Sequence, residues 1–358
     1  MSKLGDLGAR LYRGEASYNF VGNRKKFYLA SAVLLLLAIV GLAGRGLNLG
    51  IEFRGGAEYQ FSSDTATIEE TRQVVLDQGI DGAIVTQLTN PAGKTAIRIQ
   101  TPDLTTAESG DLIQALEDSF SVAEVDSRIV GPSWGSDITS KAVQALWVFL
   151  LLVSIALALL FEWRMAAAAL VALVHDVVIT IGIYALTGFE VTPATVIGVL
   201  TILGYSLYDT VVVFDKVKEN TKNLSRQNKL TYSDAANLAL NQTIVRSINT
   251  SIVALLPVTA ILVIGAGVLG AGTLRDLSLA LFIGMIAGAY SSLVIATPVL
   301  AQLKELDPEM EQLRRRVART GTAAKAAPAE AATAIASGPY IETGERRQPR
   351  RPSRSKRK

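Results

Sequence analysis

The sequence has no cysteine and only one histidine, and none of the P-loop, HExxH, GxSxG or protein-kinase motifs occurs in its 358 residues. Without cysteine there are no disulfides and no thiolate metal sites, and one histidine leaves little for any other metal site. The missing motifs exclude the common nucleotide-hydrolysing, metalloprotease and serine-hydrolase chemistries. We therefore expect a protein that is not an enzyme and binds no cofactor.

Charge is scarce as well: 19% of the residues are charged, whereas 49% are hydrophobic. This balance is too apolar for soluble domains of this length. A transmembrane helix needs roughly 20 apolar residues to cross about 30 Å of hydrocarbon. Windows of that kind predict six spans, at residues 27–46, 141–162, 165–189, 191–214, 244–268 and 274–303. The first apolar run is too long for a signal peptide and no A-x-A-like site follows it, so we expect a retained anchor.

The distribution of lysine and arginine predicts the orientation. The N-terminal segment 1–26, the connection 215–243 and the tail 304–358 are basic, so we expect all three in the cytoplasm. The segment 47–140 is strongly acidic and the link GFEVTP has no lysine or arginine, so both are expected outside. The chain is thus predicted to be a multi-pass protein of the plasma membrane with both termini in the cytoplasm.

The segment 47–140 is the only part with enough polar sequence to fold in water. AEYQF alternates as a strand, TIEETRQVVLDQGI has helical spacing with Asp64 and Thr65 available as caps, and AIVTQL and TAIRIQ flank the turn signal NPAGK. The helical stretch LTTAESGDLIQALEDSF then precedes a last strand, SVAEVDSRIV. This order predicts a ferredoxin-like domain. The predicted fold class is an all-α polytopic membrane protein with six transmembrane helices and one extracytoplasmic α+β ferredoxin-like domain.

Two polar segments lie outside this scheme. The connection 215–243 is expected to extend the fourth span and then form an amphipathic helix at the membrane interface. The tail 304–358 is rich in alanine, proline and arginine and is expected to be disordered. Its basic residues suit contact with anionic lipid or ribosomal RNA, or merely reinforce topology; we expect membrane lipids as partners and no specific nucleic acid.

Asp209 lies inside the fourth predicted span, in GYSLYDTVVVFDKVKEN (204–220). A charged aspartate near the middle of a span costs about 2.5–3.5 kcal/mol on insertion scales, so such a residue generally faces the bundle interior and has a partner. Arg246 opens the fifth span on the same side of the membrane, so we expect it to pair with Asp209. Burial favours the protonated acid and the arginine favours the carboxylate, so an aspartate with both states available is a proton-driven switch.

Other polar residues of the spans are candidates for the same proton path. His175 and Asp176 lie near the middle of the third span, and both are expected to take part. The secondary candidates are Asp215, Tyr205, Ser206, Thr210, Asn249, Thr250 and Ser251. The alternative for all of them is a structural role, since polar groups in spans also hold helices together or bond their own backbone. Gly198, Gly204, Gly284 and Gly288 are expected to allow close helix packing.

Five segments together resemble one family. GYSLYDTVVVFDKVKEN is similar to the fourth-span signature of the SecF members of the SecD/SecF family, which belong to the RND superfamily and the bacterial Sec secretion apparatus. Agreeing in order and spacing are GIEFRGG (50–56), VGPSWGSD (130–137), HDVVITIGIYAL (175–186) and NQTIVRSINTS (241–251). Tyr208 departs from the family, in which asparagine is frequent at this position. The resemblance covers about residues 20–303.

The resemblance implies an RND-like half bundle that pairs with a SecD-like subunit and works with SecYEG on unfolded preproteins, with YajC as a further candidate partner. It also implies that proton flow, with no cofactor, helps to pull or release proteins on the outer side. In that family the residues matching Asp209 and Arg246 are regarded as the proton-transport residues. The alternatives are a subunit of an RND-like proton-coupled small-molecule exporter, a purely structural subunit, and an intramembrane hydrolase using His175 and Asp176, which lacks a recognisable nucleophile.

Overall fold

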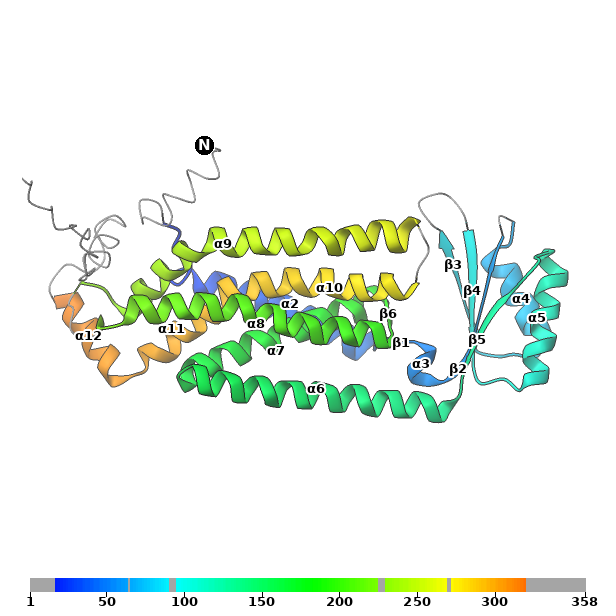
Figure 1. The fold of residues 1–358 in the computed structure, drawn as a ribbon, viewed down its shortest axis with the longest axis horizontal. Helices are drawn as coiled ribbons and strands as arrows, with labels where there is room; N and C mark the ends of the chain where they lie inside the picture. Colours follow the sequence, from blue (N-terminus) through cyan, green and yellow to red (C-terminus); the bar gives the residue numbers. More distant parts are fainter. Residues whose placement is uncertain (1–16, 64, 90–94, 225–228, 269–271, 320–358) are drawn as a thin grey trace, which may run out of the picture.

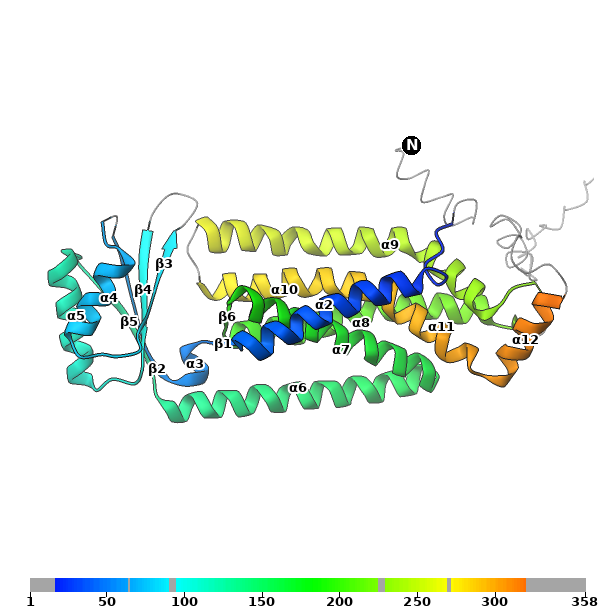
Figure 2. The same ribbon diagram turned by 180° about the vertical axis from the view of Figure 1, so that it is seen from behind.

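The computed structural model describes residues 17–63, 65–89, 95–224, 229–268 and 272–319. They form an elongated helical bundle with a small α+β domain at one end (Figure 1). Helix α12 (Pro308–Arg319) and the first described residues lie at the opposite end, as the reverse view in Figure 2 also shows. We call the two ends of the bundle the domain end and the terminal end.

Six helices are long and apolar enough to cross a membrane, which confirms the predicted fold class of a six-span bundle with an α+β region. The bundle helices are α2 (Arg24–Arg45), α6 (Pro132–Leu160), α7 (Trp163–Thr187), α8 (Pro193–Thr221), α9 (Tyr232–Ala260) and α10 (Gly272–Ser291). Helix α9 continues as a π-helix, η2 (Ile261–Val268). Helix α10 likewise continues through a π-helical turn, η3 (Ser292–Ala296), into α11 (Thr297–Glu305).

The connection predicted at 215–243 is mostly the ends of two long helices rather than a separate interfacial helix. Helix α8 continues to Thr221, and α9 already begins at Tyr232. The side chain of Thr231 accepts a hydrogen bond from the Asp234 backbone N–H, and the Asp234 carboxylate accepts one from the Thr231 N–H. This capping box satisfies donors at the helix start, so α9 extends beyond the apolar run that marked the fifth span.

Part of the predicted disordered tail is also ordered, because residues 308–319 form α12. Its apolar residues Leu313 and Val317 are fully buried against the terminal end of the bundle. On its exposed side, Arg315 pairs with Glu311 at 2.6 Å. Two large apolar residues one turn apart are enough for a short helix to dock on an existing core. The remaining tail, 320–358, and the N-terminal residues 1–16 lie outside the described part.

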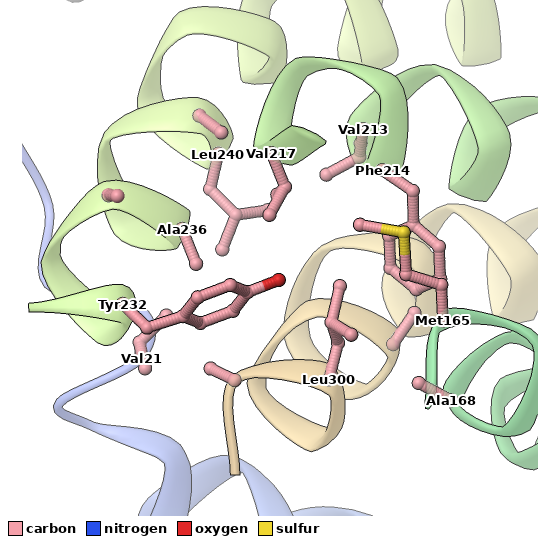
Figure 3. Packing of buried hydrophobic residues seen from close by; sticks show 14 of the residues in the cluster. Val21, Met165, Ala168, Val213, Phe214, Val217, Tyr232, Ala236, Leu240 and Leu300 are labelled. Atoms are coloured by element: carbon pink, nitrogen blue, oxygen red, sulfur yellow. The ribbon is translucent and has the colours of Figure 1, made fainter. Parts of the chain in front are cut away.

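Helices α7, α8 and α10 form the centre of the bundle, and α6 lies at its margin. In the apolar segment of α7, 56% of the residues are buried, against 6% in that of α6. Figure 3 shows the packing at the terminal end, where Tyr232 and Leu300 point into the space between the helices and Phe214 lies beside Met165. Between α8 and the last span the contact is closer, because a Cβ at Gly284 would overlap the side chain of Ile202. The central helices therefore hold any polar residue they carry away from lipid.

The glycine predictions are only partly confirmed. Gly198, Gly284 and Gly288 each face a neighbouring helix at close range. Gly204 does not, because a Cβ added there meets nothing within 4 Å. The reason is that Gly204 is exposed on α8, and the presence of a glycine in a span does not show which side of the helix it lies on.

Gly182→Ala should destabilise the chain although Gly204→Ala should not. A Cβ at Gly182 would overlap Ala38 Cβ and lie 2.5 Å from Ala38 Cα on α2. Overpacking of this kind costs about 1–3 kcal/mol, and here the obstacle is backbone that cannot rotate away. The thermal unfolding midpoint of the detergent-solubilised chain should fall for the first variant only. Equal midpoints would contradict the described α2–α7 contact.

The α+β domain has a four-stranded antiparallel sheet with the order β3-β4-β2-β5, the ferredoxin-like arrangement. The strands are β2 (Gly56–Ser62), β3 (Ile84–Thr89), β4 (Thr95–Thr101) and β5 (Asp126–Val130), and helices α4 (Ile68–Asp77) and α5 (Thr106–Phe120) cover the face away from the bundle (Figure 1). Fully buried Tyr59, Ile97, Leu112 and Leu116 fill the space between sheet and helices. The N-cap of α4 is Thr67, in a capping box with Glu70, not Asp64 or Thr65. The NPAGK turn, 90–94, lies outside the described residues.

A short connection joins the domain to the bundle. Strand β1 (Asn48–Leu49), which follows α2, pairs in parallel with β6 (Glu190–Val191), which links α7 to α8. The Gly50 N–H also donates to the Val191 carbonyl at 2.9 Å. Helix α3 (Ile51–Arg54) then leads into β2. The segment that leads from α2 into the domain is thus hydrogen-bonded directly to the link between α7 and α8.

Candidate functional site

Asp209 is buried inside the bundle, on the part of α8 where the sequence predicted an intramembrane acid. The residue is 6% exposed. Its Oδ1 accepts a hydrogen bond from Ser247 Oγ of α9 at 2.7 Å, and its Oδ2 accepts one from Ser292 Oγ of η3 at 2.5 Å. Two hydroxyl donors offset part of the cost of keeping a carboxylate in an apolar bundle. Asp209 is therefore held between three helices.

Asp176 of α7 is a second buried carboxylate, and it is bonded in the same way. The residue is 1% exposed. Its Oδ2 accepts hydrogen bonds from Ser206 Oγ of α8 at 2.5 Å and from Ser291 Oγ of α10 at 2.8 Å. Ser206 lies one turn before Asp209 on α8, and Ser291 directly precedes the serine that binds Asp209. Both acids therefore lie on one polar seam between α7, α8 and the last span.

His175 extends this seam toward α2. Its Nδ1 lies 3.2 Å from Asp176 Oδ1, and its ring stacks on Tyr290 with the centroids 6.1 Å apart. Tyr290 Oη shares a hydrogen bond of 3.1 Å with Ser31 Oγ. The other ring nitrogen, Nε2, is buried and has no hydrogen-bond partner among the described residues. The histidine is thus in contact with one acid of the pair and separated from water.

The expected pairing of Asp209 with Arg246 is not formed in this conformation. Arg246 is exposed on α9, and its Nη2 donates to Tyr208 Oη at 3.3 Å. Successive residues of a helix point about 100° apart. Because Ser247 faces Asp209, the neighbouring Arg246 points away from Asp209. Tyr208 supplies the contact that holds the guanidinium there.

The secondary candidates divide into two groups. Ser206 and Thr210 are buried on α8 beside Asp209, and Tyr205 Oη donates to Ser251 Oγ of α9 at 3.3 Å. By contrast, Asp215, Asn249 and Thr250 do not reach the two acids. Asp215 and Asn249 are exposed, and the Thr250 hydroxyl donates to the Arg246 and Ser247 carbonyls of its own helix. Sequence reasoning did not single out Ser247, Ser291 or Ser292; Ser247 directly follows the predicted Arg246, whereas the two serines of the last span had no such signal.

A second polar cluster lies at the domain end and ties the open face of the sheet to the bundle. Glu190 of β6 lies 3.0 Å from Arg98 Nη1 and accepts a hydrogen bond from Gln100 Nε2 at 2.6 Å. Arg98 is also 3.7 Å from Glu58, and Glu52 of α3 pairs with Arg128 of β5 at 2.9 Å. Burial raises the pKa of Glu190 above its ordinary value, although Gln100 and Arg98 oppose the rise. The positive charge of Arg98 therefore lies close to two partly buried carboxylates, Glu58 and Glu190, at this junction.

Comparison with known proteins gives a consistent family. The model "Protein export membrane protein SecD/SecF, C-terminal" matches residues 110–306, and "SecD/SecF GG Motif" matches residues 40–67. The protein translocase subunit SecF of Streptomyces coelicolor is 52% identical over 337 residues, which are 93% of this chain and 89% of that one. SecF of Mycobacterium tuberculosis is 40% identical over 331 residues, 88% of this chain and 74% of that one.

Longer relatives match over part of their length. The protein translocase subunit SecDF of Thermus thermophilus is 32% identical over 85% of this chain but only 41% of its own. The crystal structure of SecDF from that organism, a translocon-associated membrane protein, superimposes with a TM-score of 0.71 at 31% identity, covering 81% of this chain and 39% of that chain. The SecDF chain therefore contains a region like the present chain together with a further region.

Proposed function

The chain belongs to the SecD/SecF family of protein export membrane proteins, and from this membership we propose that it is a SecF subunit that couples proton flow to Sec-dependent protein export. The family is one of accessory translocase subunits, in agreement with the expectation that the chain is not an enzyme. The observation that carries the coupling is the pair of buried carboxylates, Asp176 and Asp209, each bonded to two serine hydroxyls. Burying an ionisable acid within membrane spans is energetically costly, and such acids are typical of proton paths.

The principal partner in this proposal is a SecD-like subunit. SecDF of Thermus thermophilus matches this chain over 41% of its length, so the remaining region of that polypeptide is expected to correspond to the partner of this chain. Helix α6 has large apolar side chains exposed, among them Trp147, Leu151 and Leu159, which suit lipid or a neighbouring span. SecYEG and unfolded preproteins complete the assembly, with YajC as a further candidate and lipid around it.

The domain end is proposed to face the outside of the cell. Basic residues gather at the terminal end, where Arg24, Lys25 and Lys26 begin α2 and Lys216 and Lys218 lie near the end of α8. An excess of lysine and arginine beside the spans marks the cytoplasmic side. Both chain termini are then cytoplasmic, and the ferredoxin-like domain lies where exported proteins emerge.

The mechanism we propose uses two positions of α9. In the conformation described here, Ser247 donates to Asp209, and Arg246 is held aside by Tyr208. Turning α9 by about one residue, roughly 100°, brings Arg246 toward Asp209 in place of Ser247. In the first position, serine hydroxyls can hydrogen-bond to Asp209 whether it is protonated or ionised. In the second position, Asp209 must be ionised to pair with the arginine. A proton crossing the membrane releases roughly 2.3 kcal/mol per 100 mV per charge, which is available to drive this exchange.

The coupling to export runs through the domain end. The link between α7 and α8 carries Glu190, which is bonded to the sheet by Arg98 and Gln100. Movement of α7 and α8 therefore shifts the link between them, and with it the domain that is bonded to this link. In this scheme the domain alternates between positions that hold and release an emerging polypeptide.

The test is preprotein transport into membrane vesicles prepared with and without the chain, in the presence or absence of a protonophore. We expect the chain to stimulate transport when the proton gradient is intact and not when it is collapsed. The co-purification of a SecD-like chain in mild detergent serves as the control for assembly. Equal stimulation with and without the gradient would contradict the coupling.

A further inference from the structure

Three consecutive residues of the last span contact the three titratable groups of the seam. Tyr290 stacks on His175, Ser291 donates to Asp176, and Ser292 donates to Asp209. Both serines are fully buried. Within four residues of the two acids and of the serines that bind them, the other titratable or charged groups are Tyr205 and Tyr208 of α8 and Arg246 of α9. The hydroxyls of Ser291 and Ser292 thus come from one short segment and reach both acids.

Each of these two hydroxyls has a second acceptor within reach. Ser292 Oγ lies 2.5 Å from Asp209 Oδ2 and 3.2 Å from the Ala289 carbonyl. Ser291 Oγ lies 2.8 Å from Asp176 Oδ2 and 3.3 Å from the Gly288 carbonyl. A serine hydroxyl carries one hydrogen, so it serves the acid or the backbone, not both fully. Each serine therefore has two bonded positions.

The serines on the other side of the acids differ in this respect. In the described part of the chain, Ser206 and Ser247 donate to a carboxylate and to no backbone carbonyl. The difference also coincides with a change of helix type, because α10 ends at Ser291 and the π-helical η3 begins at Ser292. Short π-helical turns are rare and occur frequently at functional sites.

We propose that Ser291 and Ser292 are positioning residues of the proton site, which donate to Asp176 and Asp209 when these are ionised and turn to the Gly288 and Ala289 carbonyls when they are protonated. A protonated acid has a hydrogen of its own to donate, and the serine oxygen becomes free to accept it once its own hydrogen has turned to the backbone. Neither the serine hydroxyl nor the acid oxygen that it contacts is then left without a partner in either state, which avoids the penalty of an unsatisfied polar group. This inference rests on the proposed function.

The test replaces each serine by alanine and follows the pH profile of gradient-driven export in vesicles that contain the whole complex. Ser292→Ala removes a hydrogen bond to the ionised acid that is stronger, because it is charge-assisted, than the one the serine oxygen accepts from the protonated acid, so the pH of half-maximal stimulation should rise by about one unit. Ser291→Ala should shift the profile in the same direction through Asp176. Ser292→Thr keeps the hydroxyl and should restore the original profile, a result that lost packing alone does not predict.

Ser278→Ala is the matched control. Ser278 is also buried on α10, but its hydroxyl donates only to the Leu274 and Arg275 carbonyls of its own helix at 2.6 and 3.1 Å. Its pH profile should equal that of the parent. A Ser292→Ala profile that coincides with the Ser278→Ala profile would overturn the inference and leave the proposed function intact.

Failure of the proposed function itself gives a different result. Asp209→Asn should abolish the gradient-dependent stimulation, and adding Ser292→Ala to it should change nothing further, because the serine acts through that acid. Stimulation that survives in Asp209→Asn would remove the proton site altogether. A fall in the abundance of the assembled complex in the double variant, and not in Asp209→Asn alone, would show that Ser292 acts elsewhere.

Discussion

Asp209→Asn should abolish proton-dependent stimulation of export while leaving the chain assembled with its partner. The asparagine has the same shape, and it can still hydrogen-bond to Ser247 and Ser292, whose hydroxyls rotate to accept or donate. It cannot bind or release a proton in the physiological range. The measurement is transport into vesicles with and without the gradient, together with the abundance and co-purification of the variant.

Asp215→Asn is the control, since it removes an exposed carboxylate farther along the same helix. It should retain most of the stimulation. If Asp209→Asn instead lowers abundance or assembly while each remaining complex responds normally to the gradient, the acid has a structural role. That outcome would favour the purely structural alternative.

Arg98→Ala should release the domain from the bundle at neutral pH. Arg98 compensates Glu58 and Glu190, and the three side chains are only 16–20% exposed. Removing one partner of a buried pair leaves uncompensated charge and costs about 3–5 kcal/mol, and the partial exposure here lowers this to about 2 kcal/mol. The chain has no cysteine, so spin labels at Asp111→Cys on α5 and Ala43→Cys on α2 report the separation directly. The distance distribution should broaden and lengthen.

The exposed pair of Arg72 and Glu69 on α4 provides the control for this variant. Arg72→Ala should leave the distances unchanged, because solvent-exposed ion pairs contribute at most about 1 kcal/mol. Unchanged distances in Arg98→Ala as well would show that the β1–β6 pairing alone holds the domain.

The released state should depend on pH in a direction set by Glu190. Burial raises its pKa in the docked state, so protonation favours docking: its contribution is present below the ordinary pKa of a glutamate and is lost as the pH rises through the raised value. Without Arg98, which opposes this rise, the dependence becomes stronger. Acidification should therefore shorten the label distances in Arg98→Ala, and lengthening on acidification would contradict the assignment to Glu190.

The sequence predicted the elements of this fold well, because each has a strong local signal. Six apolar windows identified the spans, and alternation with turn signals identified the ferredoxin-like domain. Helix α12 was missed because its apolar face consists of Met310, Leu313 and Val317, too little to distinguish it from a disordered tail. The β1–β6 pairing was missed because two-residue strands have no periodicity.

The site was predicted less completely, because the sequence does not show which way a side chain on a helix points. An aspartate in a span must face the interior, so Asp176 and Asp209 could be recognised from polarity alone. A serine in a span usually bonds its own backbone, as Ser278 does, and nothing in the sequence separates it from Ser292. Arg246 and Ser247 are neighbours, and only the rotation of α9 decides which of them meets Asp209.

The most direct test of the central claim is infrared titration of the reconstituted complex under an imposed proton gradient, with Asp209→Asn subtracted. We expect a carbonyl band of the protonated acid that is absent in Asp209→Asn and whose intensity changes with the gradient. A side chain that stays ionised under every gradient imposed would contradict the account.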